Sequence, residues 1–230
     1  MKYKHIFFDL DRTLWDFEVN SHETLLELCS NYNLKKIGVD DYENFIRTYK
    51  NHNAKLWDLY RVDKISQEDL RRERFQRTLA DYNIKDSLLA EKIGEDYINV
   101  CPRKNKLYPY AFEVLDYLKE RYELHIITNG FDKTQHIKLE HSNLKPYFKQ
   151  IITSEKTGVK KPNPLIFSQA ISLATASKNE SVYIGDDLIV DILGCQNFGI
   201  DGVYFNPEKT KHSECPKFEI SCLSELKKIF

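Results

Sequence analysis

The stretch Ile6-Phe7-Phe8-Asp9-Leu10-Asp11-Arg12-Thr13-Leu14 determines how the rest of this 230-residue sequence is interpreted. Its apolar start predicts a parallel strand that is buried on both faces. Ligands of open α/β sheets lie beyond the carboxyl ends of the strands. We therefore expect Asp9 and Asp11 to project together at the end of this strand.

Two carboxylates at positions i and i+2 repel each other unless a positive charge neutralises them. A hard divalent cation with oxygen ligands is the usual solution, and here it indicates Mg²⁺. The alternative is that the Asp-x-Asp sequence only closes the strand as a turn, since short motifs recur by chance. The polar residues that follow later strands must decide between the two.

Length, charge and cysteine content limit the class of protein. A chain of this length can bury one large domain or two modest ones, and its net charge of −1 predicts no nucleic-acid partner. No apolar run resembles a signal core or a membrane span, which predicts a cytoplasmic protein with no membrane partner. Five cysteines without a C-x-x-C spacing indicate neither a disulfide framework nor a cysteine zinc site. The sequence assigns no oligomeric state.

The segment 17–106 carries four helical patterns and no convincing strand. Capping-box spacing at Asn20–Glu23, Asp40–Glu43 and Ser66–Asp69 predicts the starts of three helices, and a fourth pattern covers 89–100. Prolines near the second boundary make continuation of a helix across it unfavourable. The segment is therefore interpreted as an inserted all-helical domain.

Helices and strands alternate through the remainder of the chain. The expected strands are 124–128, 150–153, 182–184, 203–205 and 218–220, and the expected helices are 110–121, 132–143, one opened by Asn163-Pro164, 188–198 and 223–229. Such alternation predicts an α/β fold with a doubly wound parallel sheet. Residues 1–16 and 107–230 would form this core, and 17–106 the helical insertion.

Two of the later strands lead into residues that can bind an anion. Thr128-Asn129-Gly130 offers a hydroxyl, an amide and a flexible backbone, although it can also be an ordinary turn. Lys161 precedes a proline and a helix start, where it can neutralise charge, although basic loop residues are commonly solvated.

A second apolar strand, Val182 to Ile184, leads through Gly185 into acids. Asp186 lies at the tip of this strand and is the natural third metal ligand, whereas Asp187 is expected to cap the next helix. Asp191 lies one helical turn beyond Asp187, where it can hold a metal-bound water or Lys161.

Taken in order, these pieces resemble the haloacid dehalogenase (HAD) superfamily. The resemblance covers the whole chain and is carried by Asp9-Leu10-Asp11-Arg12-Thr13, Thr128, Lys161 and Gly185-Asp186 to Asp191. The helical insertion after the first motif is similar to the C1-type cap of that family, and the core to its Rossmann-like fold. The continuation Thr13 to Phe17 looks most like the YjjG/YfnB group of pyrimidine 5′-nucleotidases, while Arg12 departs from the small or acidic residue often found there.

The resemblance implies a phosphoric monoester hydrolase. Asp9 would be the nucleophile that forms an aspartyl-phosphate, and Asp11 the general acid and base. Mg²⁺ would be held by the Asp9 carboxylate, the backbone carbonyl of Asp11 and the Asp186 carboxylate. Thr128, with support from the Asn129 backbone, and Lys161 would bind the phosphoryl oxygens.

The expected substrate is a small phosphomonoester, most specifically a pyrimidine nucleoside 5′-monophosphate. Phe17, Asn20, Asn53 and Trp57 of the insertion can stack on a base and recognise its edge, although aromatic residues at helical spacing are commonly core. We expect the insertion to close over the phosphate site and to exclude water from it.

Four other functions stay open from the sequence. A 2-haloacid dehalogenase is disfavoured by Asp11, which those enzymes lack, and a phosphonate hydrolase would need a Schiff-base lysine such as Lys50, Lys55 or Lys64. A sugar-phosphate phosphatase or phosphomutase shares the same core residues. A catalytically silent module that binds a phosphorylated metabolite is disfavoured by the complete set of motifs.

Overall fold

The computed structural model describes residues 2–230, and the chain divides into two compact units. One unit comprises the chain up to Phe17 together with Asn105–Phe230, and the other comprises Glu18–Lys104. The boundaries derived from the sequence, after residues 16 and 106, stay a proposal about which segments fold as core and cap.

A parallel sheet forms the centre of the first unit. Across residues 2–230 it has six strands in the order β3-β2-β1-β4-β5-β6. They are β1 (His5–Phe8), β2 (Glu123–Thr128), β3 (Gln150–Thr153), β4 (Ser181–Gly185), β5 (Asp201–Phe205) and β6 (Phe218–Ile220). The strand order reverses beside β1, which is where open α/β sheets bind their ligands.

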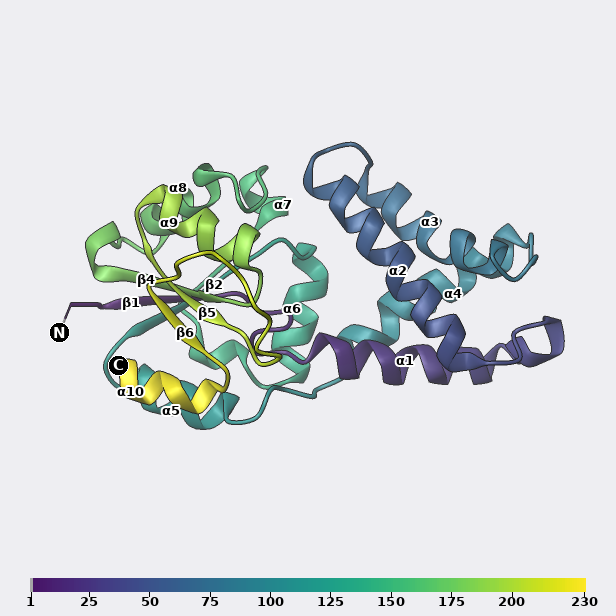
Figure 1. The fold of residues 1–230 in the computed structure, drawn as a ribbon, viewed down its shortest axis with the longest axis horizontal. Helices are drawn as coiled ribbons and strands as arrows, with labels where there is room; N and C mark the ends of the chain where they lie inside the picture. Colours follow the sequence, from purple (N-terminus) through teal and green to yellow (C-terminus); the bar gives the residue numbers. More distant parts are fainter. Residues whose placement is uncertain (1) are drawn as a thin grey trace. The chain divides into compact units, whose positions relative to one another are not determined.

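Helices cover both faces of this sheet. Helix α5 (Ala111–Lys119) packs with α10 (Leu226–Ile229) on one face, and α8 (Pro164–Leu173) packs with α9 (Gly194–Phe198) on the other (Figure 1). Helices α6 (Asp132–His141) and α7 (Ser154–Thr157) follow β2 and β3. Because both faces are covered, β1 is buried along its whole length. The predicted doubly wound α/β fold with a helical insertion is confirmed.

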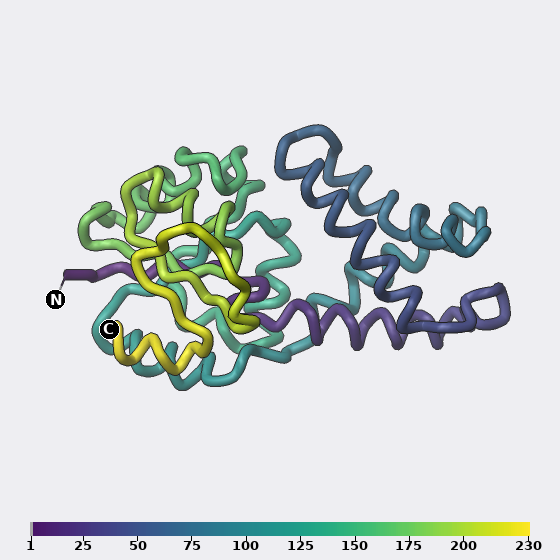
Figure 2. The backbone as a smooth tube through the Cα atoms, viewed as in Figure 1, coloured from purple at the N-terminus to yellow at the C-terminus, as the bar shows by residue number. Residues whose placement is uncertain are grey.

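The second unit is built from helices. Helix α1 (Phe17–Asn31) leads into it, followed by α2 (Tyr42–Arg61), α3 (Gln67–Ala80) and α4 (Ser87–Val100), with α3 packed against both α2 and α4 (Figure 2). Its core is aromatic: the rings of Tyr49 and Phe75 lie 4.7 Å apart, and Tyr97 contacts both. Short 3₁₀ turns complete the chain at Leu34–Ile37, Cys101–Arg103, Lys145–Tyr147, Lys178–Glu180 and Leu223–Glu225.

The predicted helix starts have different outcomes. The capping box of Ser66 and Asp69 is confirmed, with both reciprocal hydrogen bonds present. The predicted start at Asn20 is wrong, because α1 begins at Phe17 and Asn20 lies buried inside the helix. The cap of α2 is Asp41 and not Asp40. Neighbouring acids and an i, i+3 polar pair inside a helix give the same local pattern as a cap, so the spacing alone misplaced both starts.

The predicted helix 188–198 is divided into two parts. Leu188–Leu193 forms a π-helical turn, and the α-helix α9 begins only at Gly194. A π-turn is wider than an α-turn and occurs frequently at functional sites. Here it follows β4 directly and therefore adjoins the edge of the sheet where the acids gather.

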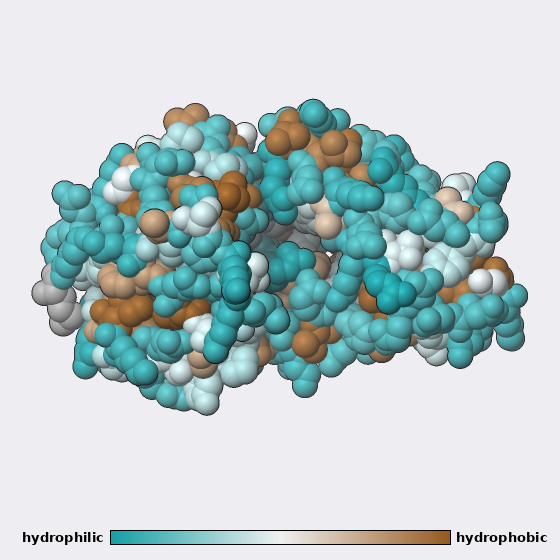
Figure 3. All heavy atoms as spheres, in the orientation of Figure 1, coloured by the Kyte–Doolittle hydropathy of each residue, from teal (hydrophilic) through white to brown (hydrophobic). Residues whose placement is uncertain are grey.

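On the face drawn in Figure 3, hydrophobic residues form small separate groups in a mainly hydrophilic surface. In the described part of the chain, no helix combines the length and apolar character needed to cross a membrane.

Candidate functional site

Three adjacent strands end in residues of the predicted site. Asp9 follows β1, Thr128 is the last residue of β2, and Asp186 follows β4. Phe8 pairs in register with Ile126 of β2 and Ile184 of β4, so these strands finish at the same edge of the sheet. Carboxylate oxygens of Asp9, Asp186 and Asp191 all lie within 4.8 Å of one another. Residues that are far apart in the sequence thus form one acidic cluster.

Lys161 is the cationic centre of this cluster. Its side chain is only 2% exposed. The Nζ atom lies 2.7 Å from Oδ1 of Asp9, 2.7 Å from Oδ1 of Asp191 and 2.8 Å from the hydroxyl of Tyr183. An ammonium group has three donors, and each meets an acceptor here, which offsets the cost of burying the charge. The open alternative that Lys161 is a solvated loop residue does not hold.

Asn129 fixes the backbone of Lys161. Its Oδ1 accepts a hydrogen bond from the Lys161 amide at 2.8 Å, and its Nδ2 donates to the Lys161 carbonyl at 3.0 Å. The end of β2 therefore positions the lysine that faces Asp9. The sequence predicts only a backbone contribution from Asn129, and the two hydrogen bonds of its side chain go beyond that prediction.

Asp191 reaches the cluster because residue 185 is glycine. A Cβ atom on Gly185 would lie 2.3 Å from Oδ2 of Asp191, so a larger residue at this position would displace the aspartate. The π-helical turn carries Asp191 beneath this strand end, where Oδ2 accepts a hydrogen bond from the Asp187 amide at 3.2 Å. Asp187 caps the turn through the amides of Ile189 and Val190, as the sequence predicts.

Asp11 has its own pair of partners, which sequence reasoning missed. Nζ of Lys138 lies 2.5 Å from its Oδ1, and Nε2 of Gln135 donates to its Oδ2 at 2.9 Å. Both partners lie on α6, and both are buried. The sequence does hold a signal for these two residues. Gln135 and Lys138 lie on the same helix face as Leu139, and a buried helix face is usually apolar.

Thr128 also belongs to this arrangement. Its Oγ1 accepts hydrogen bonds from the Gly130 amide at 3.1 Å and from Gln135 Nε2 at 2.7 Å. Since the oxygen already accepts twice, the hydroxyl hydrogen remains available to donate. Gly130 allows this contact, because a Cβ atom there would lie 2.2 Å from Nε2 of Gln135.

Arg12 adopts a left-handed backbone conformation with φ of 61°. Its guanidinium carbon lies 4.6 Å from the centre of the Phe17 ring, a cation–π contact within the first unit. Arg12, which stands where a small or acidic residue is often found, therefore fits into the turn that follows β1.

Burial dominates the electrostatics of the acids. It raises the pKa of Asp9 to about 7, although the charge of Lys161 opposes the shift. Burial, together with the charges of Asp191 and Asp9, raises the pKa of Asp186 well above its ordinary value. Burial lowers the pKa of Lys161, but Asp191 and Asp9 outweigh it and raise that pKa above its ordinary value. One lysine is too little positive charge for three ionised acids.

The donor set suits a hard divalent cation. Asp9 and Asp186 offer carboxylate oxygens, the ligands that Mg²⁺ prefers, and an added positive charge would favour their ionised forms. Both carboxylate oxygens of Asp191 are already engaged, Oδ1 by Lys161 and Oδ2 by the Asp187 amide, whereas only Oδ1 of Asp9 is paired with Lys161. Asp9 and Asp186 are therefore the side chains that could hold the cation, while Asp191 holds Lys161.

Comparison with known proteins gives a consistent picture. A family model described as haloacid dehalogenase-like hydrolase matches residues 6–205. The chain is 34% identical to the pyrimidine 5′-nucleotidase PynA of Streptococcus pneumoniae, over 98% of this chain and 94% of that protein. It is 30% identical to the pyrimidine 5′-nucleotidase YjjG of Escherichia coli, over 100% of this chain and 98% of that protein. A magnesium-bound crystal structure of the HAD hydrolase YfnB from Bacillus subtilis superposes with a TM-score of 0.90 at 29% identity, covering 100% and 99% of the two chains.

Proposed function

The chain belongs to the haloacid dehalogenase-like hydrolases, and from this premise we propose that it is a Mg²⁺-dependent phosphomonoesterase acting through an aspartyl-phosphate on Asp9. One observation carries the proposal: Asp9 and Asp11 are neighbouring carboxylates with separate cationic partners, Lys161 and Lys138. A nucleophile and a proton carrier require different environments, and the two carboxylates have them because each contacts a different lysine.

In the first half of the reaction, a carboxylate oxygen of Asp9 attacks the phosphorus atom. The new bond joins Asp9 to phosphorus, the ester bond to the leaving oxygen breaks, and Asp11 transfers a proton to that oxygen. Lys138 and Gln135 hold the Asp11 carboxylate in one orientation, which supports this role. The available hydroxyl hydrogen of Thr128 and the ammonium of Lys161 are suited to bind phosphoryl oxygens.

In the second half, water attacks the phosphorus of the aspartyl-phosphate. Asp11 accepts the proton from this water, the bond from phosphorus to Asp9 breaks, and inorganic phosphate leaves. Bound Mg²⁺, for which Asp9, Asp186 and the Asp11 carbonyl are the proposed ligands, supplies positive charge that lets an anionic phosphoryl group approach the acids.

We propose pyrimidine nucleoside 5′-monophosphates as the substrates. Two relatives of nearly full length are pyrimidine 5′-nucleotidases, which supports this class. In the helical unit, Asn53 is 6% exposed, and within residues 2–230 its buried Oδ1 has no hydrogen-bond partner. An amide oxygen of this kind suits the N–H edge of a pyrimidine. Asn20 is fully buried, whereas Phe17 and Trp57 are partly exposed, so Asn53, Phe17 and Trp57 are our candidates for base recognition.

A phosphonate hydrolase fits the chain less well. A Schiff-base lysine is activated by desolvation or by another cation, which lowers its pKa. Lys55 and Lys64 are exposed, and Nζ of Lys50 lies 2.6 Å from Oε2 of Glu18, so the group beside it is an anion and not another cation. These environments do not activate an amine.

We expect kcat/KM for dUMP or dTMP to exceed the values for dGMP and for a hexose phosphate by at least about tenfold, or 1.4 kcal/mol of transition-state discrimination. The reason is that the phosphate residues are common to all monoesters, so only recognition of the base can separate them. Release of inorganic phosphate under saturating Mg²⁺ measures all four substrates in one assay. A tenfold advantage for the hexose phosphate would overturn the nucleotidase assignment and favour a sugar phosphatase, whereas ligand-induced stabilisation without any turnover would indicate a silent binding module.

Mg²⁺ affinity should rise as the pH rises through about 7. The pKa of Asp9 is raised to about 7, so below that pH the group is mostly protonated and must lose its proton before it can bind a cation. Each pH unit below 7 should weaken binding by up to about tenfold per displaced proton. Calorimetry in buffers of different ionisation enthalpy measures both affinity and proton release. Asp9→Asn is the matched variant and should show a flatter dependence; equal affinity of the wild type at pH 6 and pH 8 would contradict the assignment.

A further inference from the structure

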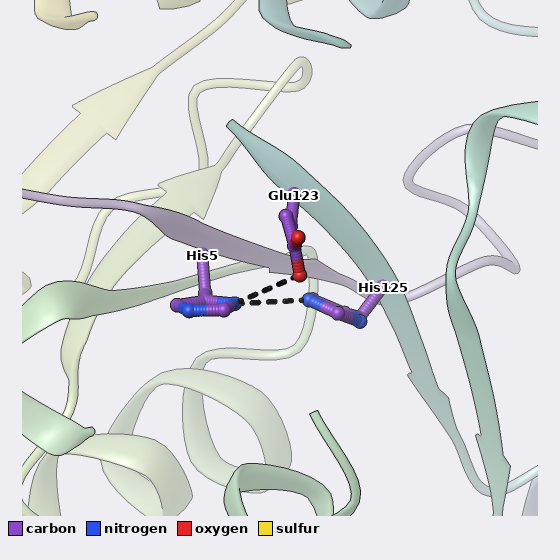
Figure 4. A group of neighbouring side chains, drawn as sticks. All are labelled: His5, Glu123 and His125. Atoms are coloured by element: carbon purple, nitrogen blue, oxygen red, sulfur yellow. Dashed lines mark hydrogen bonds and ion pairs between the residues drawn. The ribbon is translucent and has the colours of Figure 1, made fainter. Parts of the chain in front are cut away.

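A second group of metal-ligand residues lies at the opposite end of the strands from the acids. His5 is the first residue of β1, while Glu123 and His125 lie on β2, with His5 and Glu123 paired in register (Figure 4). Asp9 lies four positions after His5, roughly 13 Å along the extended chain. The two groups are therefore independent of each other.

The distances within this group match a tetrahedral site. Nδ1 of His5 lies 3.2 Å from Nε2 of His125 and 3.7 Å from Oε2 of Glu123, and one ligand atom from each residue lies within 4.8 Å of the others. Ligands about 2.0–2.1 Å from a tetrahedral zinc ion are separated from one another by about 3.3 Å. The separations of Nδ1 of His5 from His125 and Glu123 are close to that spacing.

The burial of His125 favours a metal over a protein partner. The ring is 0% exposed and stacks on Phe7 with ring centres 4.7 Å apart. In the described residues Nδ1 of His125 has no hydrogen-bond partner, and Nε2, which faces Nδ1 of His5, is the ring nitrogen that is placed to meet a metal ion. Two imidazoles that face each other without a cation can form only one hydrogen bond.

We propose that His5, Glu123 and His125 bind a divalent transition-metal ion of the zinc class. The ligands are Nδ1 of His5, Nε2 of His125 and the Glu123 carboxylate, with the fourth position open to solvent. Imidazole nitrogens select such ions over Mg²⁺, which prefers an all-oxygen set. The side chain of Glu123 is 55% exposed, which gives the ion a route from solvent. The bound ion would join β1 to β2 at their first residues and stabilise this end of the sheet.

The test uses the full-length, tag-free protein in millimolar Mg²⁺, so that the acidic cluster is occupied by its preferred ion. Zn²⁺ is titrated by calorimetry, and Cu²⁺ is added as a spectroscopic probe whose paramagnetic resonance reports the number of coordinated nitrogens. Glu123→Gln removes the exposed ligand without disturbing the core. Glu219→Gln is the matched control, because Oε2 of Glu219 pairs with Nε2 of His212 at 3.2 Å elsewhere on the sheet.

We expect one Zn²⁺ per chain, a Cu²⁺ spectrum with two nitrogen ligands, and a higher unfolding temperature with Zn²⁺. Glu123→Gln should weaken Zn²⁺ binding by at least about tenfold, whereas Glu219→Gln should bind like the wild type. The proposal is overturned if no Zn²⁺ binds, if Glu123→Gln binds as tightly as the control, or if binding is lost in Asp186→Asn, which would assign the ion to the acidic cluster. Activity is not the readout, so the result is independent of the proposed phosphatase function.

Discussion

Asp9→Asn should reduce turnover by roughly a thousandfold or more while leaving the fold intact. An amide of the same shape cannot form the acyl-phosphate bond, so the two-step route is closed. The side chain is 7% exposed, and its carboxylate lies 2.7 Å from Lys161, so the amide oxygen can still accept that hydrogen bond. Lys161 also retains Asp191 as a partner.

The same substitution should not destabilise the metal-free protein above neutral pH. The pKa of Asp9 is raised to about 7, so the ionised form is disfavoured in the folded state. Stability attributed to this group is therefore greatest at low pH and decreases as the pH rises through about 7. Asparagine carries no charge, so Asp9→Asn should not lose stability as the pH rises through about 7. Its unfolding temperature at pH 8 should therefore equal or exceed that of the wild type.

Asp187→Asn is the matched control for Asp9→Asn. It makes the same chemical change near the end of β4, at a residue whose carboxylate caps a helical turn, and asparagine caps equally well. The control should retain most of the phosphate release from dUMP. If Asp9→Asn also retained most of it, the covalent mechanism would be wrong.

The site residues that could be predicted from the sequence are those marked by a pattern of neighbouring residues. Asp9, Asp186 and Thr128 each follow an apolar run, and a strand that ends in polar residues at a parallel edge needs no long-range information to be recognised. The Ser66 capping box is local in the same way. These features could be predicted because the physical cause lies within a few residues.

The partners of those residues could not be found in that way. Lys138 and Gln135 contact Asp11 from a helix more than 120 positions away in the sequence. Tertiary packing brings this face of α6 to Asp11, and no local pattern predicts it. Tyr183 lies inside an apolar strand, where its ring predicts burial, yet its hydroxyl is one of the three acceptors around Lys161. The sequence predicts one continuous helix over 188–198, and no local pattern distinguishes the π-turn at Leu188–Leu193, whose Asp191 packs closely against Gly185.

Asp11→Asn should reduce kcat for dUMP by roughly a hundred- to ten-thousandfold, the usual contribution of a general acid and base. The loss should be smaller for p-nitrophenyl phosphate, because p-nitrophenolate departs without needing a proton. Release of phosphate and of p-nitrophenol measures the two substrates at saturating concentration. Equal losses for both would contradict proton transfer by Asp11 and leave the residue a purely structural role.

Lys138→Met tests how much the orientation of the Asp11 carboxylate matters, because this variant removes one partner of Asp11 and keeps the carboxylate itself. The ammonium lies 2.5 Å from one carboxylate oxygen, while Gln135 holds the other at 2.9 Å and would remain in the variant. Methionine keeps the bulk of the buried stem, so the fold should persist. Because the carboxylate is retained but held by one partner fewer, we expect a loss that is again larger for dUMP than for p-nitrophenyl phosphate, but smaller than that of Asp11→Asn. A loss in Lys138→Met that is equal for the two substrates would mean that the lysine acts on the phosphoryl group and not through Asp11.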